Sequence, residues 1–389
     1  MKRVGYVVDV GTTTIDSKII DLETGKDFIQ KSDRNPQRLY GSDVLTRIMT
    51  VKRDHQYLSV MRDQVLELLL RNMKSMLETI QEEHKQNHGE VIDCKVDGVV
   101  ISGNTTMISI LLNLDISDMG SFPFPTPIQE SVVGTASTLF ACEYGQTLPV
   151  SEYCTEGCKV LYTGAVSAFF GGDIVAGLLY LEKADCVEEK ENYLLLDLGT
   201  NGEMVVKKGN QFFATSTACG PAFEGCARKQ HAYGCSLLEA IALGRKLHKI
   251  HENGSLQEEY LDTGIVIHGI TLTSEILQSI MLAKSAIRAG IQCLLQEAGM
   301  ELSNLDCVYV AGGFGFHLNM KDAIYLGMFP EEFMGKAMVV GNTSLEGATF
   351  LLNHPEQISN FELMRKEILM VDLTQVKDFQ EWLITGCRL

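Results

Sequence analysis

The sequence lacks several patterns that indicate common classes of protein. None of its 11 cysteines stand in a C-x-x-C spacing, so neither zinc-ribbon pairs nor the cysteine run of an iron–sulfur ferredoxin can be formed. No G-x-x-x-x-G-K-[ST] motif is present, which excludes a P-loop. The longest apolar stretch, residues 165–181, contains Asp173 and is shorter than the roughly 20 apolar residues of a membrane span.

Basic residues are also few. The chain has 33 Lys and Arg against 50 Asp and Glu, a net charge of −17, which repels phosphate backbones and anionic lipid headgroups. Nucleic acid and membrane surfaces are therefore not expected as partners. The N-terminus reaches Asp9 before the apolar core of a secretory signal could form. Because free thiols suit a reducing compartment, we expect a soluble cytoplasmic chain without disulfides.

A short internal repeat stands out in this globular composition. Residues 6–14 read YVVDVGTTT and residues 194–202 read LLLDLGTNG, and the two aspartates are 197 − 9 = 188 positions apart in a chain of 389 residues. Each copy predicts a buried strand, a Gly-Thr turn and a second strand, which together form a β-hairpin. With a charged boundary near residues 188–192, the repeat predicts an α/β protein of two similar domains, 1–190 and 191–389.

Other elements follow from hydrophobic periodicity and from capping residues. Steps of three and four between apolar residues predict a helix over 57–86, and a continuous apolar run predicts a strand over 96–102. Thr273 is the expected N-cap of a long helix that ends at Gly299. A buried strand beginning at residue 307 then runs into a pair of glycines.

The two Asp-x-Gly-Thr turns have the chemistry of phosphate-binding loops. A glycine lets backbone amides approach an anion, and neighbouring hydroxyls add donors. An aspartate would repel the phosphate, so its expected role is to hold Mg²⁺ through water. The alternative is a turn-capping aspartate that bonds its own backbone. The candidate ligands are Asp9, Gly11, Thr12, Thr13 and Thr14 in the first turn, and Asp197, Gly199, Thr200, Asn201 and Gly202 in the second.

A third candidate segment is the glycine pair that follows the strand at 307–311. Gly312 and Gly313 would let a flat base and its ribose lie against the backbone, with Phe314 beside them. Taken alone, this pattern is equally typical of an ordinary strand-to-helix turn. Its position after two phosphate hairpins favours binding of adenosine.

In this order the three segments resemble the superfamily of acetate and sugar kinases, heat-shock chaperones and actin. Further segments narrow the resemblance to the ATP-dependent reductive activators of corrinoid proteins. These segments are residues 35–43, 103–107, 172–177, 197–203, 220–225 and 283–290.

The resemblance implies two actin-like domains around an interdomain nucleotide cleft, with ATP and Mg²⁺ as cofactors. It implies an ATPase that docks on a corrinoid methyl-carrier protein and drives the reduction of Co(II) to Co(I), and it makes a homodimer plausible. Family members reduce cobalt with an iron–sulfur domain, whereas this sequence has no cysteine cluster for one. We therefore expect electrons from a separate donor such as a ferredoxin; otherwise the chain is an ATPase that remodels or senses a corrinoid protein without reducing it, or its function has drifted. The alternatives are a small-molecule kinase of the same superfamily and a nucleotide-sensing interaction module.

Four further residues are candidates with an open alternative. Glu203 would orient the attacking water, or it is an exposed strand residue; with Asp9 and Asp197 it completes the catalytic set. Gly220 and Glu224 would contact the nucleotide, Glu224 at the ribose or water. Lys284 would reach the adenosine, or it is a solvated helix lysine. A separate cluster, Cys219, Cys226, Cys235 and His231, has no known metal spacing, and its cysteines are expected to be inert.

Overall fold

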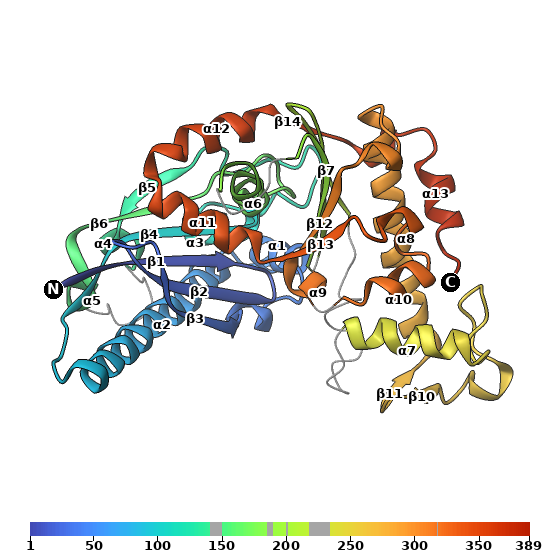
Figure 1. Ribbon diagram of the computed structural model, residues 1–389, viewed down its shortest axis with the longest axis horizontal. Coiled ribbons are helices and arrows are strands. Elements are labelled where there is room, and N and C mark those ends of the chain that lie inside the picture. Colours follow the sequence, from blue (N-terminus) through green and yellow to red (C-terminus); the bar gives the residue numbers. More distant parts are fainter. Residues whose placement is uncertain (141–149, 185–189, 200, 218–233, 317) are drawn as a thin grey trace. The chain divides into compact units, whose positions relative to one another are not determined.

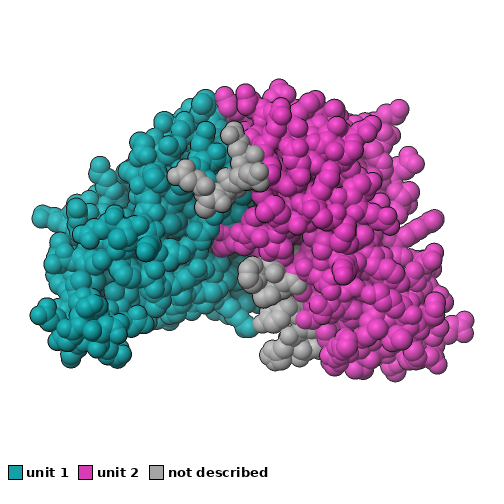
Figure 2. All heavy atoms as spheres, in the orientation of Figure 1, with its two compact units in different colours: residues 1–188, 343–366 teal, residues 189–342, 367–389 magenta. Residues whose placement is uncertain are grey.

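The computed structural model describes residues 1–140, 150–184, 190–199, 201–217, 234–316 and 318–389. The chain forms two compact units (Figures 1 and 2). The first comprises residues 1–188 and 343–366, and the second comprises residues 189–342 and 367–389. Within the described ranges, no helix is long and apolar enough to cross a membrane.

A six-stranded sheet forms the centre of the first unit. Its order is β3 (Asp27–Arg34), β2 (Thr14–Asp21), β1 (Lys2–Val10), β4 (Cys94–Gly103), β6 (Cys154–Tyr162) and β5 (Val132–Thr135). The first three strands are antiparallel neighbours, whereas β1, β4 and β6 run parallel to one another. β5 returns antiparallel to β6.

A second six-stranded sheet forms the centre of the other unit. Its order is β13 (Ala337–Gly341), β12 (Cys307–Ala311), β7 (Asn192–Leu198), β8 (Gly202–Lys208), β9 (Gln211–Thr217) and β14 (Ile368–Met370). β7, β8 and β9 are antiparallel neighbours, and β7, β12 and β13 run parallel. β10 (Ile265–Ile267) and β11 (Ile270–Leu272) pair separately.

The two sheets repeat the same five-strand order. The first contains β3-β2-β1-β4-β6, and the second contains β9-β8-β7-β12-β13 with the same parallel and antiparallel relations. β1 and β7, which carry the two repeated motifs, hold equivalent central places. The predicted α/β architecture of two actin-like domains is confirmed, and so are both predicted hairpins, β1–β2 and β7–β8.

Helices cover both faces of the first sheet (Figure 1). They are α1 (Val44–Arg53), α2 (Gln56–His88), α3 (Thr105–Leu111), α4 (Ala136–Leu139), α5 (Val150–Tyr153), α6 (Gly172–Lys183), α11 (Thr343–Asn353) and α12 (Ile358–Glu367). On one face, the Tyr6 hydroxyl donates to the Leu69 carbonyl of α2 at 3.1 Å. On the other, a Cβ at Gly98 would lie 3.0 Å from Leu352 of α11, so a glycine there permits the close approach of this helix.

The return of residues 343–366 to the first unit corrects the predicted boundary. The sequence prediction assigned everything after residue 190 to the second domain. However, residues 343–366 belong to the first unit, and α11, drawn in orange-red, lies against the first sheet (Figure 1). A buried lysine of β2 helps to hold α11 there, because Lys18 Nζ lies 2.6 Å from Glu346 and 2.9 Å from Asp27.

The second unit contains several helices, the longest of which packs on β8 and β9. They are α7 (Gly234–Lys246), α8 (Ser274–Glu297), α9 (Gly312–Phe316), α10 (Met320–Tyr325) and α13 (Phe379–Thr385). As predicted, Thr273 caps α8 by accepting a hydrogen bond from the Ile276 amide. The apolar face of α8, which includes Ile280 and Ile287, is buried in the same core as Leu194 of β7. The long helix predicted over 57–86 is also confirmed, as α2.

Candidate functional site

The first candidate turn joins β1 to β2 in the first unit. Val10 and Ile15 are the last paired residues of the hairpin, so residues 11–14 form the turn. A Cβ at Gly11 would lie 2.7 Å from the Thr14 carbonyl oxygen, closer than side chains tolerate. The tight turn therefore requires glycine at its first position.

Donors from the same unit bind three consecutive carbonyl oxygens of this turn. Asn35 Nδ2 donates to the Gly11 oxygen at 2.8 Å, and the Asn35 amide donates to the Thr13 oxygen at 2.9 Å. Arg47 Nη2 donates to the Thr12 oxygen at 2.5 Å. In a trans peptide the N–H points opposite to the carbonyl, so the amides of Thr12 and Thr13 face away from these donors. Such a row of amides is suited to an anion.

The Thr12 side chain is held by the loop after β4. Asn104 Nδ2 donates to Thr12 Oγ1 at 3.0 Å, while Asn104 Oδ1 accepts from the Met107 amide at 3.0 Å and caps α3. Thr12 is buried, whereas Thr14 is exposed. A hydroxyl that accepts one hydrogen bond can still donate its own proton. Thr12 can therefore offer this proton to a ligand at the turn.

Each hairpin places two carboxylates directly opposite one another. Asp9 of β1 pairs in register with Asp16 of β2, and Asp197 of β7 pairs with Glu203 of β8. All four are half-buried. Directly opposed like charges destabilise a sheet, and a divalent cation nearby would relieve this repulsion. The sequence reasoning missed Asp16, because the first turn is one residue longer than the second and the aligned repeats place Asp16 opposite Met204 instead of Glu203.

The second turn lies next to the glycine pair within the second unit. Gly312 has a φ of +83°. A Cβ there would lie 2.6 Å from Asp197 Oδ1 and 2.7 Å from the Leu198 oxygen, so only glycine fits. The structure thus brings Asp197 and Gly312 together, as a nucleotide site would require. Gly313 is exposed, and no described atom lies within 4 Å of a Cβ built on it.

The remaining residues of these two segments are placed as follows. The Gly199 amide donates to the Asn201 oxygen at 3.0 Å, which closes the second turn. Gly202 is buried at the start of β8, and Phe314 lies in α9. Thr200, Gly220 and Glu224 lie outside the described residues, as do Cys219, Cys226 and His231.

Lys284 is buried, whereas a solvated helix lysine would be exposed. Its exposed fraction is 0%. Its Nζ donates to the carbonyl oxygens of Gly386, at 2.9 Å, and Arg388. Burial, with a smaller contribution from Arg288, lowers the pKa of Lys284 to about 8. The solvated alternative is wrong because α13 packs on α8 and the residues after it cover this flank. Contact of the ammonium with adenosine would require displacement of these carbonyls.

Of the cluster formed by Cys219, Cys226, His231 and Cys235, only Cys235 lies within the described residues. Cys235 lies half-buried in α7, and burial raises the pKa of its thiol to about 11. Within the described ranges, no group of three or more His, Cys, Asp and Glu side chains could hold a metal ion directly. Coordination of Mg²⁺ through water, the role predicted for Asp9 and Asp197, does not need such a group.

Two family models together match most of the chain. Residues 4–184 match the model described as the RACo middle region. Residues 191–234 and 239–389 match the model described as the C-terminal domain of RACo, the ASKHA domain, which is half of the chain. The first match ends at residue 184 and the second begins at residue 191.

Similar proteins have also been characterised or solved. The chain is 25% identical over 409 aligned positions to "Corrinoid activation enzyme RamQ" of Eubacterium limosum, covering 91% of this chain and 65% of that protein. It is 23% identical to "[Co(II) methylated amine-specific corrinoid protein] reductase" of Methanosarcina barkeri, covering 94% of this chain and 72% of that protein.

A solved "Reductive activator for corrinoid,iron-sulfur protein" superposes with a TM-score of 0.79 at 24% identity, covering 100% of this chain and 66% of that one. At this identity the likeness establishes the fold. The present chain thus spans about two thirds of the length of these relatives.

Proposed function

Because the chain belongs to the RACo family, we propose that it hydrolyses ATP to activate a corrinoid protein, by driving the reduction of Co(II) to Co(I). The printed names of the two curated relatives support this reaction, since one is a corrinoid activation enzyme and the other a Co(II) corrinoid protein reductase. The observation that carries the ATP part is the turn at residues 11–14. Its carbonyls are bound by Asn35 and Arg47, so its amides are oriented for phosphate.

The phosphates of ATP would be held by both turns. Gly11, Thr12, Thr13 and Thr14 would supply amides and hydroxyls from the first turn. Gly199, Thr200, Asn201 and Gly202 would supply them from the second. These are the groups that bind phosphate in glycine-containing turns.

Mg²⁺ would be held through water by Asp9 and Asp197, each of which faces a second carboxylate on the neighbouring strand. The ion would neutralise phosphate charge during hydrolysis. Glu203, opposite Asp197, would orient the attacking water. Gly312, Gly313 and Phe314 would contact the adenosine, with Gly220 and Glu224 as further nucleotide ligands.

The electron needed for each Co(II) would come from an iron–sulfur donor such as a ferredoxin, outside residues 1–389. One electron converts one Co(II) to Co(I), and the hydrolysis of ATP supplies the free energy for this uphill step. The partner would be a corrinoid methyl-carrier protein, and the working form a homodimer in the cytoplasm.

The test is steady-state ATP hydrolysis with and without a corrinoid methyl-carrier protein held in the Co(II) state. We expect the carrier to stimulate hydrolysis, and we expect Asp197→Asn to abolish the stimulated rate. Asp322→Asn is the matched control, because it removes an aspartate of the same unit that pairs with Lys246 and is not a proposed ligand of ATP or Mg²⁺. Turnover that ignores the carrier would refute the corrinoid assignment and favour a small-molecule kinase.

A further inference from the structure

Arg47 of α1 is a buried cation whose described oxygen partners are all uncharged. Its exposed fraction is 0%. Nε donates to the Gly41 carbonyl at 3.1 Å, Nη1 to the Gln37 side-chain oxygen at 3.1 Å, and Nη2 to the Thr12 carbonyl at 2.5 Å. These contacts satisfy donors of the guanidinium, but they do not neutralise its charge.

A second buried arginine of the same unit, Arg62, forms an ion pair with a carboxylate, which is the usual way in which a buried charge is compensated. Arg62 Nη1 lies 3.3 Å from Asp63 Oδ1, so its charge is compensated in the folded protein. Among the described residues, no carboxylate oxygen lies within 4.0 Å of the Arg47 guanidinium. Burial lowers the pKa of Arg47 to about 10, with Asp43 opposing this effect, so the side chain is still a cation at neutral pH. An unpaired buried charge is costly and requires an explanation.

The charge lies directly behind the first turn. Nη2 holds the Thr12 oxygen, and the amide of the same peptide, which belongs to Thr13, points to the opposite side. A cation on the carbonyl polarises this peptide and strengthens its N–H as a donor. An anion that accepts from the Thr13 amide would therefore interact with the charge of Arg47 through one peptide group.

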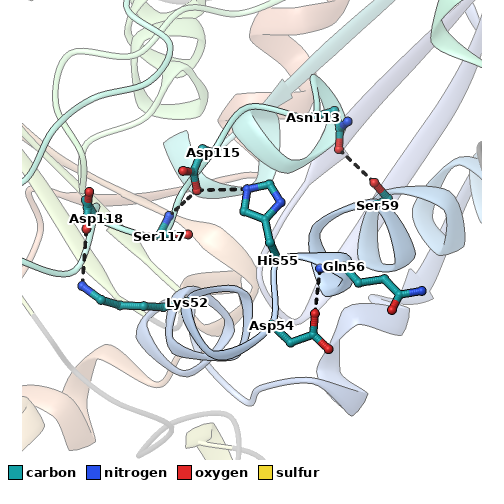
Figure 3. A network of polar contacts seen from close by, with 9 residues as sticks. All are labelled: Lys52, Asp54, His55, Gln56, Ser59, Asn113, Asp115, Ser117 and Asp118. Carbon is teal, nitrogen blue, oxygen red and sulfur yellow. Dashed lines mark hydrogen bonds and ion pairs between the residues drawn. The ribbon is translucent and has the colours of Figure 1, made fainter.

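Polar contacts at both ends of α1 hold this helix, and therefore Arg47, in position. At the N-terminus, the Asp43 side chain accepts from the Thr46 amide at 2.9 Å and completes a capping box. At the C-terminus, a polar network joins Lys52 of the helix, and residues 55–59 that follow it, to residues 113–118 (Figure 3). In this network Lys52 Nζ lies 3.3 Å from Asp118 and His55 Nε2 lies 3.5 Å from Asp115.

We infer that Arg47 is a positioning residue that supplies the buried countercharge for a polyphosphate anion bound at the turn of residues 11–14. The inference rests on the proposed binding of ATP and deepens it by assigning the charge that selects for phosphate. The contribution of Arg47 to affinity then grows with the number of phosphates on the ligand. Adenosine, which has none, gains nothing from it.

The experiment measures binding of ATP, ADP, AMP and adenosine by isothermal titration calorimetry at two salt concentrations. Arg47→Gln is compared with the wild type and with Arg62→Gln, which removes a buried arginine of equal size whose contacts are with Leu111 and Asp63 and not with the turn. We expect Arg47→Gln to weaken ATP binding by about tenfold or more, AMP binding less, and adenosine binding not at all. The salt dependence of ATP binding should also fall. Arg62→Gln should leave the ranking of the four ligands unchanged.

Two further variants keep the inference testable if Arg47→Gln does not fold. Arg47→Met also removes the charge while filling the volume, and Arg47→Lys retains the charge with fewer donors. The lysine variant should preserve the ranking of the ligands, and the methionine variant should lose it. Equal losses for all four ligands, or loss of the ranking in Arg47→Lys, would overturn the inference. If the wild type binds no ATP, the proposed function fails instead.

Discussion

Ser344 donates a hydrogen bond of 2.8 Å to Asp9, which stands 335 positions earlier in the chain. Ser344 Oγ also lies 3.1 Å from Ser102 Oγ. Ser344 is the second residue after the chain passes from the second unit back to the first at residues 342–343. The first turn of α11 thus orients the carboxylate that we propose to hold Mg²⁺.

Replacing Ser344 by alanine should slow ATP hydrolysis. Without the hydroxyl, the Asp9 carboxylate loses a donor that fixes its rotamer, and loss of such a supporting contact typically costs about 10–100-fold in metal affinity or activity. We expect kcat to fall and the Mg²⁺ concentration for half-maximal rate to rise, with little change in KM for ATP. Ser344→Thr retains the hydroxyl and should retain most of the rate. Equal rates for alanine and wild type would contradict the positioning role.

The two adjacent glycines after β12 should differ sharply in their tolerance of alanine. Gly312 has a φ of +83°, and a Cβ there would lie 2.6 Å from Asp197 Oδ1. Gly312→Ala should therefore displace Asp197 and weaken nucleotide binding by about tenfold or more, by analogy with other strained backbone positions. Gly313→Ala meets no described atom of the protein and leaves Asp197 in place, so it should weaken binding far less, through its contact with the adenosine alone. Fluorescence titration with a labelled ATP analogue measures both, and similar affinities would refute the close approach.

Asn104 has two roles that one substitution can separate. Its Oδ1 caps α3 and its Nδ2 donates to Thr12. Aspartate caps a helix as well as asparagine does, but it cannot donate and it adds negative charge beside the turn. Asn104→Asp should therefore keep the melting temperature within a few degrees and raise KM for ATP. Asn104→Ala, which loses both roles, should lower both stability and affinity. An unchanged KM in Asn104→Asp would exclude Thr12 from phosphate binding.

Lys284 should make the stability of the second unit depend on pH. Its pKa is about 8 in the folded protein, lowered from 10.5 by burial and by Arg288, with Cys387 opposing. Between these two values the unfolded chain binds more protons, so the free energy of unfolding rises with pH through this window. The slope from this group is at most about 1.4 kcal/mol per pH unit. Below pH 8 the group is charged in both states and adds no slope.

The measurement uses the single tryptophan of the chain. Trp382 lies in α13, which packs on α8, so its fluorescence reports on unfolding of the second unit. Urea titrations of wild type and Lys284→Met are compared from pH 7.5 to 10.5. Because tyrosines and cysteines titrate in the same range, the informative quantity is the difference between the two proteins. A difference that does not change with pH would show that Lys284 has an ordinary pKa.

Local patterns predicted a large part of the fold. Thr273 was expected as a helix cap and is one, because its side chain competes for an amide only three residues away. The helix expected over 57–86 is α2, Gln56–His88, because its apolar period already matches one face of a helix. The two hairpins followed from a buried run and a Gly-Thr turn repeated at a distance of half the chain. Each of these signals lies within a few residues of the structure that it specifies.

The sequence by itself determined the two repeated hairpins, the glycine pair and the resemblance to a family. Only the tertiary structure shows that α11 packs on the first sheet, that Ser344 donates a hydrogen bond to Asp9, and that Arg47 and Lys284 are buried. The reason is physical. A hydrogen bond between residues 335 positions apart leaves no local periodicity in either segment, because it depends on the path of the whole chain. Likewise, a lysine or arginine has the same local pattern whether solvent or a packed helix covers it.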